Sequence, residues 1–152
     1  MLGVVCTHMN NFLKIVTDTD IIWSEAAFED EEMVEAFTNG ELDDEPTLDP
    51  MRPAWKVLNC RWNHMLAEQF VDYMIREVGR KEEERGDIRD AFAKRLVRLR
   101  TTLMTNARRD GETEKDWRER VEEEMAKDVA RSRGNTRRAT VSTGFSGNWN
   151  ND

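Results

Sequence analysis

Cysteine and histidine are the residues of this chain with the most distinctive chemistry, and there are only two of each. Cys60 and His64 lie one helical turn apart, a spacing that metal ligands use, and Cys6 with His8 would complete a four-ligand zinc site. A buried thiol beside a packed imidazole is the more ordinary interpretation. We therefore expect no metal ion and no cofactor. Two thiols this far apart in a highly charged chain indicate a reduced, intracellular protein of the nucleus or cytoplasm.

Catalytic motifs are absent from the sequence. No glycine-rich loop precedes a helix, and neither a Gly-x-Ser-x-Gly element nor a His-Glu-x-x-His motif occurs. The acidic runs at 82–84 and 122–124 are typical of solvated helix faces rather than of paired general acids and bases. We therefore expect no enzymatic activity, and a helical enzyme is the least favoured of three hypotheses.

Basic side chains that suit phosphate or carboxylate contacts cluster after residue 93. Lys94, Arg95 and Arg98 fall close together at helical spacing, and guanidinium groups are good phosphate ligands. The whole candidate set for binding a partner or a nucleic acid is Lys94, Arg95, Arg98, Arg100, Arg108 and Arg109. The same face could also be solvated, or could dock the chain's own acidic segment, because the sequence pI is only 4.9.

The charges are separated along the chain. Residues 18–49 contain thirteen acidic residues and no Lys or Arg, whereas residues 51–110 contain fourteen basic and nine acidic residues. This asymmetry indicates binding to a charged partner or within the chain itself. The acidic segment also carries Trp23, Phe28 and Phe37. It therefore fits either a partner's groove, as disordered activation segments do, or a plain acidic helix that covers the rest of the fold.

Two shorter patterns are candidates for regulation and for contact with bases. The Arg-Arg-Ala-Thr motif at 137–140 fits the pattern of basophilic kinases, so Thr140 is a candidate phosphorylation site. Trp55, Trp62 and Trp117 could stack on bases, and their spacing loosely resembles the three-helix modules related to Myb and SANT domains, which have shorter helices. Large rings at helical spacing more commonly form a core.

The elements that would position these side chains are helices. Apolar residues recur every three or four positions in three long segments, 52–79, 87–109 and 113–132. Pro53 suits a first helical turn, and Gly79 follows the last periodic residue as a stop. Gly111 and Gly134 are expected to end the two later helices in the same way.

The remaining segments are shorter or irregular. A short acidic helix is expected over 24–38, and Pro46 and Pro50 make the segment after it an exposed linker. The sequence thus predicts an all-α fold, a three-helix bundle with a short acidic N-terminal helix and a flexible C-terminal tail. Residues 1–17 are expected to form a helix or strand, and residues 18–50 an acidic arm and linker. Residues 51–133 are expected to form the helical bundle, and residues 134–152 a disordered tail.

One resemblance covers about residues 52–140. It is carried by Trp55, Trp62, Asn63, Phe70, Asp87, Ile88, Arg89, Phe92, Arg98 and Arg100, followed by a charged helix and an Arg-Arg segment. On these residues the chain resembles a group of uncharacterised helical proteins of basidiomycete fungi. The resemblance implies a helical fold with an acidic N-terminal region, and it implies no activity.

From these patterns we expect a non-enzymatic helical interaction domain that binds an acidic protein partner, or its own acidic arm, through the basic helix face. The alternative is a DNA- or RNA-binding helical module associated with transcription or transposition. The expected partner is a protein in the first case and a nucleic acid in the second. We expect no membrane partner, since no apolar run approaches about 20 residues. The sequence sets no oligomeric state.

Overall fold

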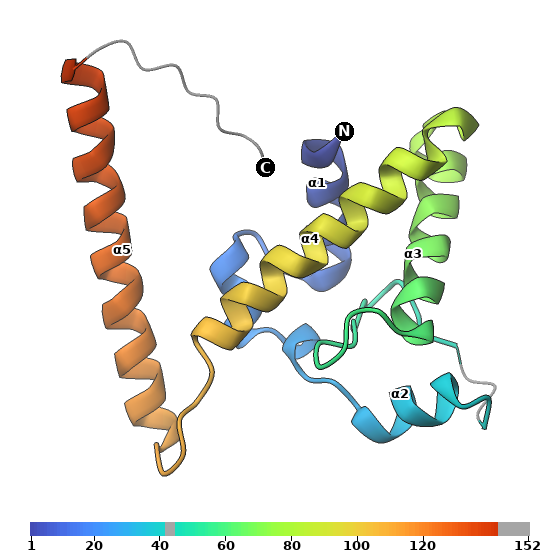
Figure 1. Ribbon diagram of the computed structural model, residues 1–152, viewed down its shortest axis with the longest axis horizontal. Coiled ribbons are helices and arrows are strands. Elements are labelled where there is room, and N and C mark those ends of the chain that lie inside the picture. The colour runs from blue at the N-terminus through green and yellow to red at the C-terminus, as the bar shows by residue number, and fades with distance from the viewer. Residues whose placement is uncertain (42–44, 143–152) are drawn as a thin grey trace. The chain divides into compact units, whose positions relative to one another are not determined.

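The computed structural model describes residues 1–41 and 45–142, with side chains described as far as Arg131. All regular structure in these residues is helical, which confirms the all-α class (Figure 1). The α-helices are α1 (Leu2–Leu13), α2 (Glu31–Thr38), α3 (Arg61–Tyr73), α4 (Arg85–Thr105) and α5 (Glu114–Ser142). The short elements are the 3-10 helices η1 (Asp18–Trp23), η2 (Glu25–Ala27) and η4 (Glu82–Glu84) and the π-helix η3 (Met74–Val78). The described residues contain five α-helices, whereas the sequence predicted a three-helix bundle with one short acidic helix before it.

The chain divides into two compact units, unit 1 (Met1–Thr105) and unit 2 (Asn106–Asp152). The arm expected over residues 18–50 is part of unit 1. Residues 1–17, which contain helix α1, are also part of unit 1. Val5, Met9 and Ile21 are fully buried there, and both α1 and η1 contact α4. The difference arises because apolar residues within the polar N-terminal third are needed to cover α4.

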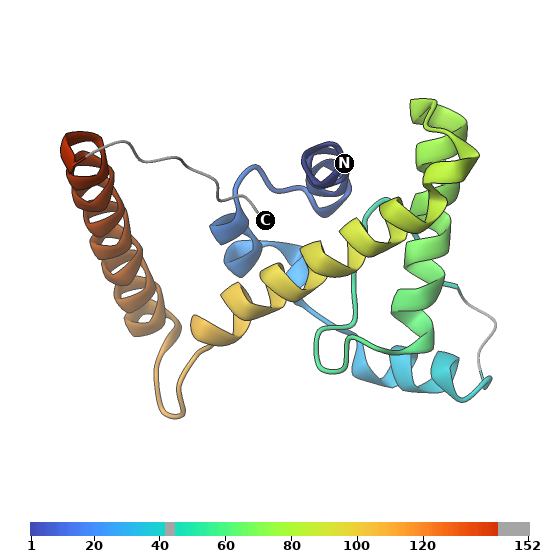
Figure 2. The same cartoon turned by 45° about the horizontal axis from the view of Figure 1, so that its top comes forward.

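The core of unit 1 lies where α4 passes across α1 and α3, as Figures 1 and 2 show from two directions. The stripe expected on α4 is buried at Ile88, Phe92, Leu96 and Leu99. Phe92 packs on Phe70 of α3, with ring centroids 5.4 Å apart. The ring centroid of Phe70 in turn lies 6.3 Å from that of Phe12 of α1, so aromatic rings from three helices meet in the core.

The predicted helix over 52–79 was wrong in its first nine residues, because α3 begins only at Arg61. The cause is Asn63, whose buried side chain accepts the Ala54 N–H at 2.8 Å and donates to the Ala54 carbonyl at 2.8 Å. Its Nδ2 also donates to the Leu58 carbonyl at 3.0 Å. These bonds hold the backbone before α3 in an irregular path. The expected stop is correct, since Gly79 ends η3 with a φ of 86°.

Two tryptophans and one glutamate stabilise the same irregular segment through hydrogen bonds. The indole N–H of Trp55 donates to the Ala26 carbonyl at 2.7 Å, and that of Trp62 donates to the Arg52 carbonyl at 2.9 Å. The Glu29 carboxylate accepts the backbone N–H groups of Trp55 at 2.5 Å and of Lys56 at 2.9 Å. Both rings are buried, so they belong to the core and do not face solvent for stacking on bases.

The acidic helix expected over 24–38 is shorter in the structure. Residues 25–27 form the 3-10 turn η2, and α2 begins at Glu31, where the Asp30 carboxylate accepts the Met33 N–H at 3.0 Å. Aspartate is among the residues favoured at this capping position. The helix ends at Asn39 and Gly40, as expected, and Gly40 has a φ of 75°.

Unit 2 is a turn followed by the long helix α5. The Thr113 hydroxyl accepts the Asp116 N–H at 3.1 Å, which confirms the predicted helix start. Glu112 in the turn accepts two N–H groups of Arg120, at 2.7 and 2.9 Å, and the Arg109 N–H at 3.0 Å. The predicted stop at Gly134 was wrong, since α5 continues to Ser142. The rest of the predicted tail, 143–152, lies outside the described residues.

Replacing Asn63 should weaken unit 1 at its least helical point. Asn63→Ala removes the partners of the Ala54 N–H and of two carbonyls, and we expect a loss of about 2 kcal/mol of unfolding free energy. Urea unfolding followed by circular dichroism measures this. Asn59→Ala, an exposed asparagine in the same segment, should change stability by less than about 0.5 kcal/mol. Equal effects of the two substitutions would contradict the role of Asn63.

Glu112 should make the turn of unit 2 sensitive to acid. Hydrogen bonds from Arg120 and from the Arg109 N–H lower the pKa of Glu112 from 4.5 to about 2. A lowered folded-state pKa stabilises above the unfolded value, so this contribution is full above pH about 4.5 and is lost as pH falls toward about 2. Carboxyl NMR titration of the whole chain should show the low pKa, and Arg120→Gln should raise it. An ordinary pKa in the unchanged chain would contradict the contact.

Candidate interaction site

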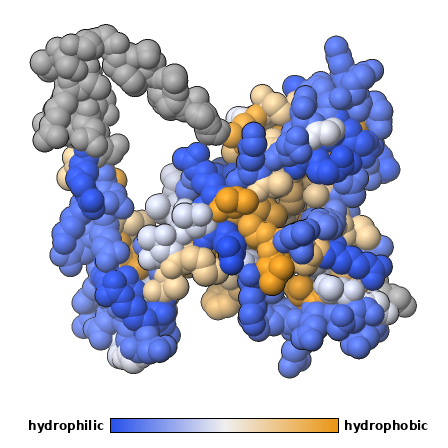
Figure 3. Space-filling view, in the orientation of Figure 1, coloured by the Kyte–Doolittle hydropathy of each residue, from blue (hydrophilic) through white to orange (hydrophobic). Residues whose placement is uncertain are grey.

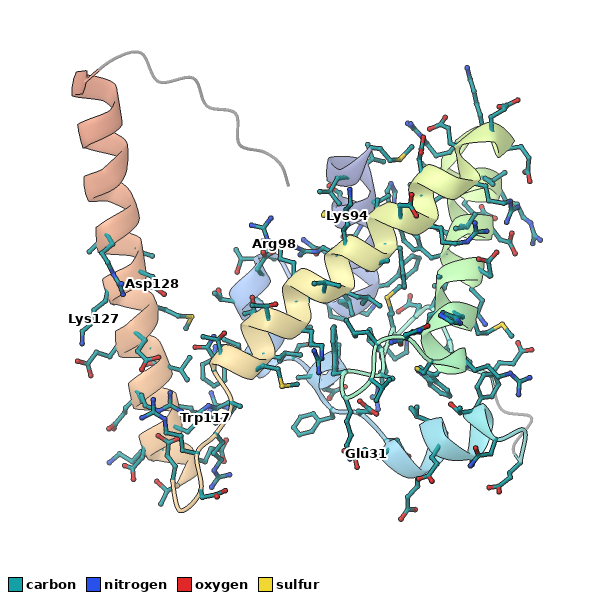
Figure 4. The ribbon with its side chains drawn as sticks, in the orientation of Figure 1. Glu31, Lys94, Arg98, Trp117, Lys127 and Asp128 are labelled. Carbon is teal, nitrogen blue, oxygen red and sulfur yellow. The ribbon has the colours of Figure 1, made fainter. Side chains whose placement is uncertain are left out.

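The basic residues singled out in the sequence are divided between the two units. Lys94, Arg95, Arg98 and Arg100 lie on α4 of unit 1, whereas Arg108 and Arg109 lie in the turn of unit 2. On α4, Lys94 and Arg98 project from the same side of the helix (Figure 4) and are exposed. Arg100 follows Arg98 by two residues, which corresponds to about 200° of helical rotation. It therefore lies on the other side of α4.

Arg95 is the buried centre of a polar cluster that joins three elements of unit 1. Only 4% of this residue is exposed. One terminal nitrogen donates to Asp18 of η1 at 2.6 Å, and the other donates to the Asn10 side chain of α1 at 2.7 Å. The second Asp18 oxygen forms an ion pair with Arg98, 2.9 Å from its Nε. Asp18 thus bridges two arginines of α4, and we call these four residues the Asp18 cluster.

The turn that carries Asp18 is itself fixed by hydrogen bonds. The Asp20 carboxylate accepts the backbone N–H groups of Thr17 at 2.9 Å and of Val16 at 3.0 Å. These bonds, that of Thr17 first, lower the pKa of Asp20, so the side chain is anionic at neutral pH. The start of η1 is thereby held against α4, and Asp18 is presented to Arg95 in a fixed position.

Arg100 is also committed to the chain's own backbone. Its Nε donates to the Trp55 carbonyl at 2.7 Å, and a terminal nitrogen donates to the Lys56 carbonyl at 3.3 Å. It ties α4 to the irregular segment before α3. In unit 2, Arg108 Nε similarly donates to the Glu112 carbonyl at 2.7 Å. Within the described residues, the side chains of Lys94 and Arg109 are the members of the predicted set with no hydrogen bond or ion pair.

The sequence did not indicate the apolar groove that lies between α3 and α4. This groove has a volume of about 420 Å³ and is lined at one end by Leu58 and Asn59, which belong to the irregular segment before α3, residues 52–60. Its apolar lining comes from Leu58, Ala67, Phe92, Ala93, Leu96 and Val97. In Figure 3, hydrophobic surface gathers over α4 and that segment. Val97 is 56% exposed, and Val57, which lies within that segment, is 59% exposed. We call this depression the α3–α4 groove.

Charged side chains fix the rim of the groove at its other end. Arg89 of α4 binds both oxygens of Glu68 of α3, at 2.6 and 3.0 Å. The hydrogen bond from Arg89 lowers the pKa of Glu68, and the same bond raises the pKa of Arg89, so both groups are charged at neutral pH. His64 and Asp90 also line this end. The pair holds α3 and α4 in register beside the groove.

The Cys and His side chains considered as metal ligands are not grouped into a metal site within the described residues, and the candidate phosphorylation site lies beyond the described side chains. Cys6 and Cys60 are not joined in a disulfide, and His8 Nδ1 lies 3.2 Å from the Tyr73 hydroxyl. Among the described residues, no three His, Cys, Asp or Glu side chains are grouped so as to hold a metal ion. Trp117 of unit 2 is half-buried, and its indole donates to the Asn106 carbonyl at 2.8 Å. The side chain of Thr140 lies outside the described residues.

The described helices are also too short or too polar to cross a membrane. Comparison with known proteins adds no relative: no family model matches the chain, and no curated protein or solved structure is significantly similar to it. The geometry of unit 1 is therefore the basis for a functional proposal.

Proposed function

We propose that this chain is a non-enzymatic helical interaction module whose own acidic segment occupies the basic residues of α4, and whose α3–α4 groove receives an apolar helix face of a protein partner. The observation that carries the proposal is the groove itself, an open apolar depression beside α4, whose residues Arg95 and Arg98 are already paired within the chain. In this proposal the groove, and not the basic face of α4, is the site that binds a partner.

The size and lining of the groove suit a helix. A volume of about 420 Å³ accommodates two or three large apolar side chains, and sites of this kind bind residues at positions i, i+3 or i+4, and i+7 of a partner helix. Val97 and Ala93 lie one turn apart along α4 and leave an apolar strip exposed. Covering this strip removes apolar surface from water, which is the main favourable contribution to such binding.

The Asp18 cluster supports the intramolecular half of the proposal. Burial of the Arg95 guanidinium is favourable only with an anionic partner, and Asp18 supplies that charge. On this side of α4, an incoming acidic protein or nucleic acid would meet Lys94 and the outer part of Arg98, which is 63% exposed. Unit 1 as a whole contains 21 acidic and 13 basic residues, which opposes contact with a phosphate backbone. The nucleic-acid alternative is therefore less favoured.

Removing the charge of Asp18 should destabilise unit 1 without creating a nucleic-acid site. In Asp18→Asn the buried Arg95 loses its counter-charge, and we expect a loss of about 2 kcal/mol in urea unfolding because Asp18 is only partly buried. Asp90→Asn on α4 has no ion pair to lose among the described residues and serves as the matched control. Duplex DNA titrated into both full-length variants should not bind. Unchanged stability, or DNA binding by Asp18→Asn alone, would instead identify a displaceable arm over a nucleic-acid face.

The groove is tested with helical peptides selected from a randomised library on the full-length chain. Peptides with an apolar stripe should be enriched, and Val97→Asp should weaken their binding at least about tenfold because a carboxylate then enters the apolar strip. Val129→Asp is the matched control, since Val129 is 49% exposed and lies on α5 of unit 2. Fluorescence anisotropy measures the affinities. Selected peptides that bind both variants equally well would contradict the assignment of the groove.

A further inference from the structure

The α3–α4 groove has an acidic neighbour on the other side of the segment before α3. This second depression, about 320 Å³ in volume, lies between α2 and that segment. Asn59 lines both depressions, while Leu58 lines the groove and Val57 lines its neighbour. A rod-shaped partner seated in the groove therefore meets the surface of α2 when it extends past this segment.

Acidic side chains outnumber basic ones around the two depressions. Those that line them are Glu29, Glu31, Glu35, Glu68 and Asp90, against Lys56 and Arg89. Arg89 is neutralised by Glu68, and Lys56 faces Glu31 at 3.7 Å. Neighbouring Arg100 is occupied by backbone carbonyls. Glu35 and Asp90 are exposed and have no ion pair among the described residues.

We infer that the partner helix is cationic, with Lys or Arg flanking its apolar stripe, and that Glu35 and Asp90 receive these charges on the two sides of the segment before α3. This inference rests on the proposed function and specifies its partner. The whole of unit 1 adds to the effect, because its formal charge is −8 whereas residues 106–152 carry ten acidic and ten basic residues. Such a field speeds association with cations and repels anions.

The same charges favour this partner over the other occupants of the groove. A second copy of unit 1 would bring a further charge of −8 to an acidic rim, and a nucleic acid would bring phosphates. Like charges at a contact reduce affinity, whereas opposite charges increase it and set the orientation of the partner.

The test compares two synthetic helical peptides that share one leucine stripe and differ only in flanking residues, Lys in one and Glu in the other. With the full-length chain at low salt, the Lys peptide should bind about tenfold more tightly, since several exposed ion pairs each contribute a fraction of a kcal/mol. The difference should shrink at physiological ionic strength. Val97→Asp should weaken both peptides.

Charge reversal at the rim separates local contacts from the overall field. The double variant Glu35→Lys/Asp90→Lys should remove the preference for the Lys peptide. The control Glu77→Lys/Glu83→Lys changes the net charge equally at exposed positions that line neither depression, and it should retain most of the preference. Equal losses in the two double variants would overturn the assignment to Glu35 and Asp90.

The remaining outcomes distinguish this inference from the function it rests on. Equal affinity for the two peptides, with both still sensitive to Val97→Asp, would overturn the cationic partner and leave the groove as a helix site. Failure of both peptides to bind would overturn the proposed function as well. A dimer in analytical ultracentrifugation that Val97→Asp dissociates would assign the groove to a second copy of the chain.

Discussion

The buried guanidinium of Arg95 is the constraint on which the arrangement of unit 1 depends. A charge at this depth requires an anionic acceptor, and the chain provides one 77 positions earlier, at Asp18. Meeting that requirement fixes η1 against α4, and the bond from Arg95 to Asn10 fixes α1 beside it. The N-terminal third is thereby part of the core. An acidic sequence that resembles a solvated arm is folded because its apolar residues cover α4 and one of its carboxylates has a specific buried partner.

The two sides of α4 then acquire different roles. On one side, Asp18 pairs with Arg95 and Arg98, so that most of the positive charge is used within the fold. On the other side, Arg100 donates a hydrogen bond to the segment before α3, and residues of that segment line one end of an apolar groove. The outcome is an acidic unit with one open apolar surface. This combination suits recognition of a cationic helix, in which the apolar strip supplies affinity and the rim supplies charge selectivity.

Much of the helical structure could be predicted from local patterns, and the exceptions have identifiable causes. The periodic stripe of α4 and the Thr113 cap of α5 depend on neighbouring residues alone, and both were correct. The start of α3 depends on Asn63 bonding to Ala54, nine residues upstream, and no helical period reports such a contact. The position of Arg95 carried a usable signal, since it lies three residues after Phe92 and four before Leu99, at the edge of the buried stripe. The groove gave no such signal, because it forms only where Leu58 meets α4.

Native-state hydrogen exchange on the full-length chain tests most directly whether the N-terminal segment belongs to the fold. Interior amides of α1, such as that of Met9, should exchange within about tenfold of core amides of α4, such as that of Leu96, because one cooperative opening exposes both. Exchange of the α1 amides at close to the unprotected rate, with α4 still protected, would contradict this expectation. In that case residues 1–50 would be a detachable arm, and the buried Arg95 would need another explanation.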